Sequence, residues 1–117
     1  MRTFVSELKK QLPPKESSGF RVFKAIKAGK YSLSIQGSDG HYCTPRQIMP
    51  PEGYISMEVA IFNKRKEWFH TSRSRTIRQF PRYAELRERA DGSSKITVFG
   101  YVPVDLIEDL YLYLKNV

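Results

Sequence analysis

The chain has 117 residues, which is enough for one hydrophobic core but not for two, so we expect a single domain over 1–117. Hydrophobic residues make up 40% and charged residues 27% of the sequence, close to the globular average, which excludes disorder from end to end. The formal net charge of +8 suits the protein to a negatively charged partner.

The sequence also bears on the compartment. No apolar run approaches the roughly 18 residues needed to span a bilayer, and the N-terminus lacks the apolar segment of a secretory signal. The single cysteine, Cys43, cannot form a disulfide within the chain, which fits a reducing compartment. We therefore expect a cytoplasmic protein without membrane contact.

The first third of the chain predicts one helix and one hairpin. Apolar residues at helical spacing predict an amphipathic helix over 3–12, and residues 15–19 have loop composition. Segment 20–27 fits neither the helical nor the strand period cleanly, and we favour a strand over a helix. Residues 31–36 alternate apolar and polar as a half-buried strand does, so the two segments are expected to pair.

The middle of the chain predicts a strand in the interior of the sheet. Residues 54–62 carry apolar groups on both faces, with Ile55, Met57, Val59 and Ile61 on one of them. A four-residue turn at 63–66 connects this strand to a second one at 67–71. Residues 73–82 follow no regular period.

The last third predicts a helix, a strand and a second helix. Pro81 opens a short helix that runs to about Ala90. Residues 95–102 alternate as a strand, in which Gly100 marks a bulge or a close approach. The helix after Pro103 buries a stripe of leucine and isoleucine: Leu106, Ile107, Leu110 and Leu114. The predicted class is α+β, an antiparallel sheet of four or five strands with an N-terminal and a C-terminal helix packed on one face.

No motif in the sequence specifies a reaction. A small Cys-His hydrolase would use Cys43 with His41 or His70. Side chains two apart in a strand lie about 6 to 7 Å from each other, so His70 would be the better base. Because free cysteines are commonly buried and inert, we expect Cys43 to pack as a small apolar residue, and we predict no catalytic residue.

Metal and cofactor sites are not predicted either. A zinc site needs closely spaced ligand pairs, which the candidates by residue type do not supply: Asp39, His41, Cys43 and His70. The carboxylates available for Mg²⁺ are scattered along the chain: Asp39, Glu52 and Glu58. Gly37 and Gly40 lie in a turn that does not lead from a strand into a helix, so there is no nucleotide-binding fingerprint.

The positive charge is concentrated in two blocks. Residues 1–30 hold eight Lys/Arg and two acidic residues, and residues 63–82 hold seven Lys/Arg and one acidic residue. The intervening and final stretches are net negative. If the fold brings the two blocks together they form one positive face, and otherwise they are ordinary solvated surface.

The second block interleaves cations with aromatic residues. Nucleic-acid binders use Lys and Arg to replace counterions around phosphates, and aromatic side chains to stack on bases. Trp68 and Phe69 would point to opposite faces of a strand, so at least one is expected in the core. The predicted binding residues are Lys64, Arg65, Lys66, Trp68, Arg73, Arg75, Arg78 and Arg82.

We therefore predict a small, basic, non-catalytic binding protein that docks on nucleic acid or on a nucleic-acid-bearing complex. The alternative is a protein-binding inhibitor or adaptor, such as an accessory protein of a phage or mobile element, that contacts an acidic protein surface. Arginine and aromatic residues also concentrate binding energy at protein interfaces, so the sequence does not separate the two partner classes. It contains no zinc finger, basic zipper or other recognisable nucleic-acid motif.

Overall fold

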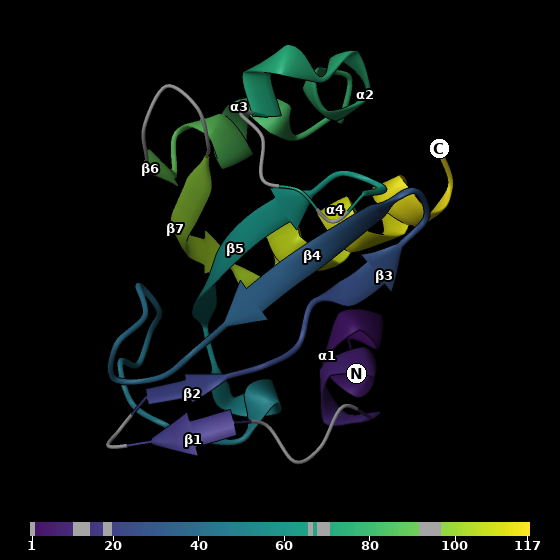
Figure 1. The fold of residues 1–117 in the computed structure, drawn as a ribbon. Helices are drawn as coiled ribbons and strands as arrows, with labels where there is room; N and C mark the ends of the chain where they lie inside the picture. Colours follow the sequence, from purple (N-terminus) through teal and green to yellow (C-terminus); the bar gives the residue numbers. More distant parts are fainter. Residues whose placement is uncertain (1, 11–14, 18–19, 66, 68–70, 92–96) are drawn as a thin grey trace.

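The computed structural model describes residues 2–10, 15–17, 20–65, 67, 71–91 and 97–117. Within these residues the main body is a five-stranded antiparallel sheet with strand order β3-β4-β5-β7-β6 (Figure 1). Its strands are β3 (Ile26–Ala28), β4 (Tyr31–Gln36), β5 (Ser56–Phe62), β6 (Ala90–Asp91) and β7 (Val98–Pro103). A separate pair is formed by β1 (Lys15–Ser17) and β2 (Phe20–Val22).

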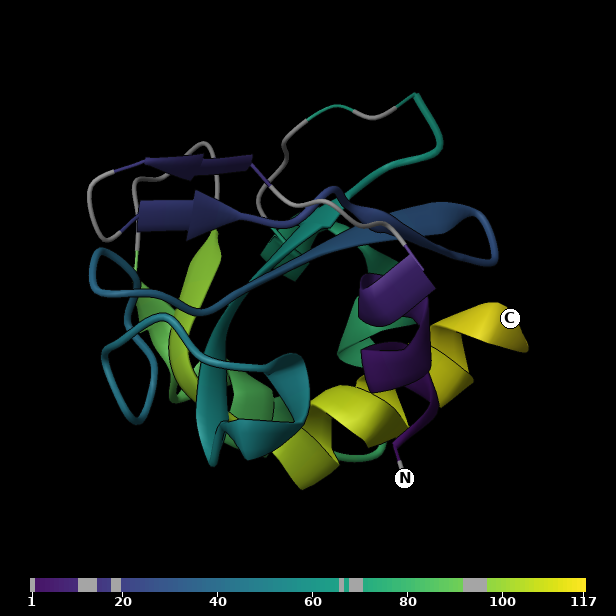
Figure 2. The same ribbon diagram turned by 90° about the horizontal axis from the view of Figure 1, so that it is seen from below.

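Helices α1 (Thr3–Lys10) and α4 (Val104–Lys115) cover one face of this sheet (Figure 2). The Glu108 carboxylate of α4 accepts hydrogen bonds from the Thr3 hydroxyl, at 2.5 Å, and from the Phe4 N–H, at 3.1 Å, so α4 caps the start of α1. This arrangement confirms the predicted α+β class. No helix in the described part of the chain is long and apolar enough to cross a membrane.

The described ranges also contain four short helical segments. They are η1 (Pro51–Gly53), η2 (Thr71–Arg73), α2 (Arg75–Arg78) and α3 (Tyr83–Arg87). Ile77 of α2 and Leu86 of α3 are fully buried, which ties both helices to the core despite their length.

The core lies between the sheet and the two long helices. Met57, Val59 and Ile61 of β5 are fully buried on the helix side, and each contributes about 2 kcal/mol through burial. The stripe predicted for the last helix, Leu106, Ile107, Leu110 and Leu114, is confirmed. Ile55 was expected on the same face as Met57, but it is 69% exposed because the strand begins only at Ser56.

Strand β5 is interior to the sheet as predicted, since β4 pairs with one of its edges and β7 with the other. We call the face opposite α1 and α4 the outer face. The register aligns Lys27, Ser32 and Phe62 in one row of side chains across this face. A second row on the same face lies two residues further along the strands and contains Ser34, Ala60, Val98 and Asp91. Figure 1 looks onto this face.

Segment 20–27 is two strands rather than one. β2 pairs with β1, and β3 pairs with β4. The chain leaves the ladder at Phe23 because the Gln36 side chain accepts from the Phe23 N–H and donates to the Phe23 carbonyl, both at 2.8 Å. A side-chain amide thus takes the place of a neighbouring strand, which explains why the segment showed no clean period.

The predicted strand at 67–71 is wrong at the two ends that the structure describes. Glu67 belongs to no strand and Thr71 opens η2, while residues 66 and 68–70 lie outside the described part. A strand has only two edges, and β4 and β7 occupy both edges of β5. The fifth strand of the sheet is β6. The helix predicted to run to about Ala90 is shorter, because Ala90 belongs to β6 and pairs with Phe99.

Candidate nucleic-acid interface

The turn after β5 presents two of the predicted binding residues. The Asn63 side-chain oxygen accepts from the N–H groups of Arg65 and Glu67, at 2.9 and 3.0 Å, and the Asn63 N–H donates to the Glu67 carbonyl at 3.1 Å. This bonding closes the loop and leaves Lys64 and Arg65 exposed at its tip. Lys66 and Trp68 lie outside the described residues.

The arginine run folds into η2 and α2. The Ser74 hydroxyl caps α2 by accepting from the Ile77 N–H at 3.2 Å, and buried Ile77 anchors the helix. Arg73, Arg75 and Arg78 are exposed. Among the residues that the structure describes, no carboxylate forms an ion pair with any of these three or with Lys64 and Arg65.

Part of the first basic block lies next to the second. The Tyr31 hydroxyl is 3.3 Å from the Ser74 hydroxyl, so the side chain next to Lys30 in the sequence contacts the residue between Arg73 and Arg75. The register row that joins Lys27 to Phe62 places the β3 side of this turn at the same end of the sheet as Lys64 (Figure 1). We call this cluster the basic end: Lys27, Lys30, Lys64, Arg65, Arg73 and Arg75.

Other cations of the first block are held elsewhere. Lys9 pairs with Glu52 at 3.3 Å, and Lys10 pairs with Glu7 at 2.8 Å. Arg21 is buried and donates to the Met49 and Gly37 carbonyls and the Tyr54 hydroxyl, at 2.6, 2.9 and 2.8 Å. The first block therefore reaches the basic end through Lys27 and Lys30.

Among the predicted binding residues that the structure describes, Arg82 is the one whose charge is compensated by carboxylates. Its guanidinium contacts Glu85 at 2.7 Å, Asp109 at 2.6 Å and Asp105 at 3.2 Å. Hydrogen bonds to Glu85 and the other carboxylates raise the pKa of Arg82, and the same hydrogen bond lowers the pKa of Glu85. Arg82 thus links α3 to α4 and adds little to the positive surface.

The candidate Cys-His chemistry meets an unsuitable environment. Cys43 is 1% exposed, and its thiol sulfur lies 3.3 Å from two carbonyl oxygens, those of Ser38 and Pro45, to either of which it can donate its one hydrogen. Burial raises the pKa of Cys43, which favours the thiol over the nucleophilic thiolate. His41 Nδ1 pairs instead with the Ser38 hydroxyl at 2.7 Å, and Ser38 is itself fully buried. His70 lies outside the described residues.

The sequence predicts no metal site. In the described ranges no three His, Cys, Asp or Glu side chains are grouped so that they could hold a metal ion.

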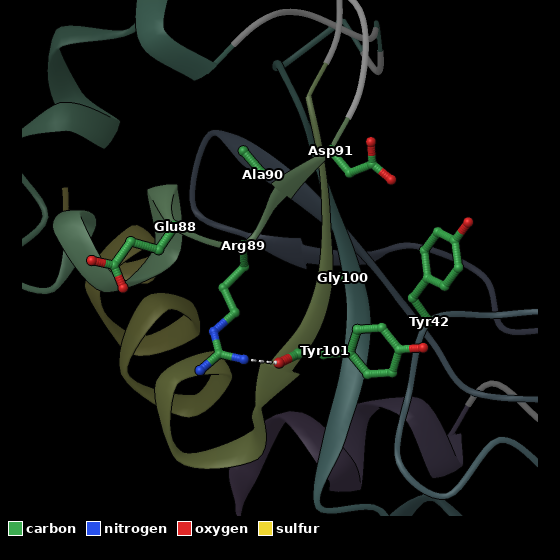
Figure 3. A pocket seen from close by; sticks show the side chains of 7 residues that line it. All are labelled: Tyr42, Glu88, Arg89, Ala90, Asp91, Gly100 and Tyr101. Carbon is green, nitrogen blue, oxygen red and sulfur yellow. Dashed lines mark hydrogen bonds between the residues drawn. The ribbon is translucent and has the colours of Figure 1, made fainter.

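Sequence reasoning did not identify a hollow of about 420 Å³ beside β6 and β7 (Figure 3). Its lining includes Tyr42, Glu88, Arg89, Asp91, Gly100 and Tyr101. Tyr42 and Tyr101 are far apart in the sequence and come together through backbone contacts. Gly100 was the one residue whose sequence context pointed to this place. A glycine inside a strand pattern predicted a bulge or a close approach, and Tyr42 does approach Gly100 closely.

No protein family, curated protein or solved structure matches this chain.

Proposed function

We propose that the protein binds nucleic acid through the basic end. The observation that carries this proposal is the contact between Tyr31, which follows Lys30 in the chain, and Ser74, which lies between Arg73 and Arg75. Exposed cations held close together repel one another, and a polyanion relieves this repulsion. The fold maintains the cluster without a compensating ion pair from the described residues, in contrast to Arg82.

The mechanism is neutralisation of backbone phosphates. The six cations come from four places in the chain: β3, the β3–β4 turn, the turn after β5 and the η2–α2 segment. Arginine forks bind phosphate oxygens in pairs, whereas lysines act as point charges. Each phosphate contact releases counterions, so affinity falls as salt rises. Such contacts position a nucleic acid without reading its sequence.

Fluorescence anisotropy with a labelled single-stranded DNA tests the proposal. The triple variant Lys64→Gln, Arg73→Gln, Arg75→Gln is compared with the control Arg2→Gln, Lys9→Gln, Lys10→Gln, which loses the same charge around α1. We expect the first variant to bind at least about tenfold more weakly at low salt, and the control to stay within about threefold of the wild type.

Surface ion pairs such as Lys9 with Glu52 contribute little to stability, so both variants should fold. Circular dichroism of both variants checks this. Equal losses in the two variants would mean that net charge, not the basic end, governs binding. Absence of wild-type binding to DNA and RNA at low salt would reject the proposal and favour the acidic protein partner.

A further inference from the structure

Two tyrosines form an exposed pair of rings at the hollow beside β7 (Figure 3). The ring centroids of Tyr42 and Tyr101 are 5.7 Å apart with planes inclined by 31°. The residues are 44% and 41% exposed, and the Arg46 guanidinium lies 5.6 Å from the Tyr42 ring centroid. Exposed aromatic pairs flanked by a cation are typical of surfaces that receive a planar ligand.

A β-bulge directs Tyr101 into this position. Met57 pairs with Val102 and Val59 with Phe99, so Gly100 and Tyr101 both stand opposite Glu58. Tyr101 has a φ of 52°, a left-handed conformation that is unfavourable for a bulky residue. Bulges and strained residues of this kind concentrate at binding sites, where they reorient a side chain.

Two hydrogen bonds to the backbone of Tyr101, each from another segment, hold this residue in place. The Tyr101 N–H donates to the Tyr42 carbonyl at 2.9 Å, and the Tyr101 carbonyl accepts from Arg89 Nη1 at 2.6 Å. A Cβ on Gly100 would lie 3.1 Å from the Cβ of Tyr42, so the glycine lets Tyr42 pack closely on the strand. The ring pair is therefore preorganised rather than a chance feature of a loose loop.

The charges at the hollow suit a base better than a phosphate. The Arg89 contact to Tyr101 uses one of the five N–H donors of its guanidinium. Glu88 and Asp91 both line the hollow, and the Asp91 carboxylate would repel a phosphate group there, whereas Figure 3 shows that the Glu88 side chain projects away from the two rings. In Figure 3 Asp91 projects to the same side of β7 as the two rings. A carboxylate there accepts hydrogen bonds from an exocyclic amino group, as on cytosine.

The hollow lies on the same outer face of the sheet as Lys27, one of the residues of the basic end. Val98 lies on that face in the row of Ser34 and Ala60, and Gly100 follows it by two residues on β7. With about 4.8 Å between strands and 3.3 Å per residue, Gly100 lies roughly 15 to 20 Å from Phe62 and Lys27. A short single strand of a few nucleotides spans that distance.

We propose that the hollow at Tyr42 and Tyr101 receives one base of a single-stranded nucleic acid whose backbone is held at the basic end; this inference rests on the proposed function. The strand must be single because a duplex keeps its bases stacked inside, away from protein rings. The preferred base carries an exocyclic amino group, which Asp91 accepts.

The test compares Tyr42→Ala and Tyr101→Gly with the wild type on dC12, dT12 and a 12-base-pair duplex. Glycine at 101 tolerates the left-handed backbone, so this variant removes the ring without straining the fold. We expect each variant to bind dC12 about tenfold more weakly, with duplex affinity unchanged. Tyr42→Phe and Tyr101→Phe keep the ring face and should bind within about twofold of the wild type.

The outcomes separate this inference from the proposed function. Unchanged dC12 affinity in both ring variants, with a loss in the Lys64, Arg73 and Arg75 variant, would overturn the base site and leave the basic end intact. Absence of any wild-type binding would overturn both. The wild type should also prefer dC12 over dT12, and Asp91→Ala should abolish that preference; no initial preference would overturn the assigned role of Asp91.

Discussion

Arg82 concentrates three carboxylate contacts in one side chain that is 28% exposed. Arg82→Gln should lower the free energy of unfolding by about 1 kcal/mol at low salt, and by less in 1 M salt, because ion pairs near the surface are screened. Urea unfolding measures the change. Arg78→Gln is the matched control, since no described carboxylate pairs with Arg78, and it should leave the midpoint unchanged. Equal urea midpoints for the two variants would mean that the carboxylate contacts of Arg82 contribute nothing to stability.

His41 makes the stability of the fold depend on pH. Burial lowers the pKa of His41, with a smaller contribution from the Arg21 cation and opposition from Glu58. In the unfolded chain His41 therefore binds a proton as the pH falls to about 6.5, whereas in the folded chain it stays neutral to a lower pH. Stability contributed by neutral His41 is full above about pH 6.5 and is lost as the pH falls through and below it.

Urea midpoints measured between pH 8 and pH 5 should accordingly decrease as the pH falls, and His41→Asn should flatten this dependence. Asparagine retains a polar partner for the Ser38 hydroxyl, which contacts His41 at 2.7 Å. His70→Gln controls for the second histidine. A pH dependence that persists unchanged in the His41 variant would assign it to other groups.

At the scale of the elements, the β3–β4 turn couples the sheet to α4. Gly29 has a φ of 62°, and a Cβ there would overlap the Leu114 carbonyl oxygen. Gly29→Ala should therefore destabilise the protein by about 2 kcal/mol or more, since strain and overlap add. Urea unfolding checks this, with Lys30→Ala as an exposed neighbour that should change little. An unaltered midpoint in Gly29→Ala would show that the turn does not press on α4.

Elements with a long, regular period were predictable from the sequence. The interior strand has strong alternation and is confirmed over Ser56–Phe62, two residues shorter than the predicted 54–62. The last helix has a clear apolar stripe and is confirmed over Val104–Lys115. Segment 20–27 was ambiguous because the Gln36 amide replaces strand pairing at Phe23. The strand at 67–71 was wrong because local pattern does not show that both edges of β5 are already paired.

The candidate site was predictable in composition but not in geometry. The sequence located the exposed cations at Lys64, Arg65 and the arginine run, since charge patterning is local. It did not show that Arg82 faces three carboxylates, which come from α3 and α4. It also missed the ring pair at Tyr42, because that pair depends on a bulge and on backbone contacts between distant segments.

At the scale of the whole molecule, the two charge blocks do not merge completely. Lys27 and Lys30 reach the basic end, whereas Lys9 and Lys10 pair with acids elsewhere and Arg21 is buried. Lys27 and the tyrosine pair therefore occupy separate parts of the outer face. In the proposed binding mode, phosphate contacts and base contacts fall on different parts of the molecule.

The salt dependence of binding should resolve those two parts. For a single strand, log affinity falls against log salt with a slope of about −0.7 per phosphate contact. Removing Lys64, Arg73 and Arg75 should reduce the steepness by up to about 2, since three contacts are lost. Tyr101→Gly should weaken binding while leaving the slope unchanged, because stacking releases no counterions. Anisotropy titrations from 50 to 300 mM salt measure both quantities. A slope that changes in the tyrosine variant would show that the hollow contacts phosphate rather than a base.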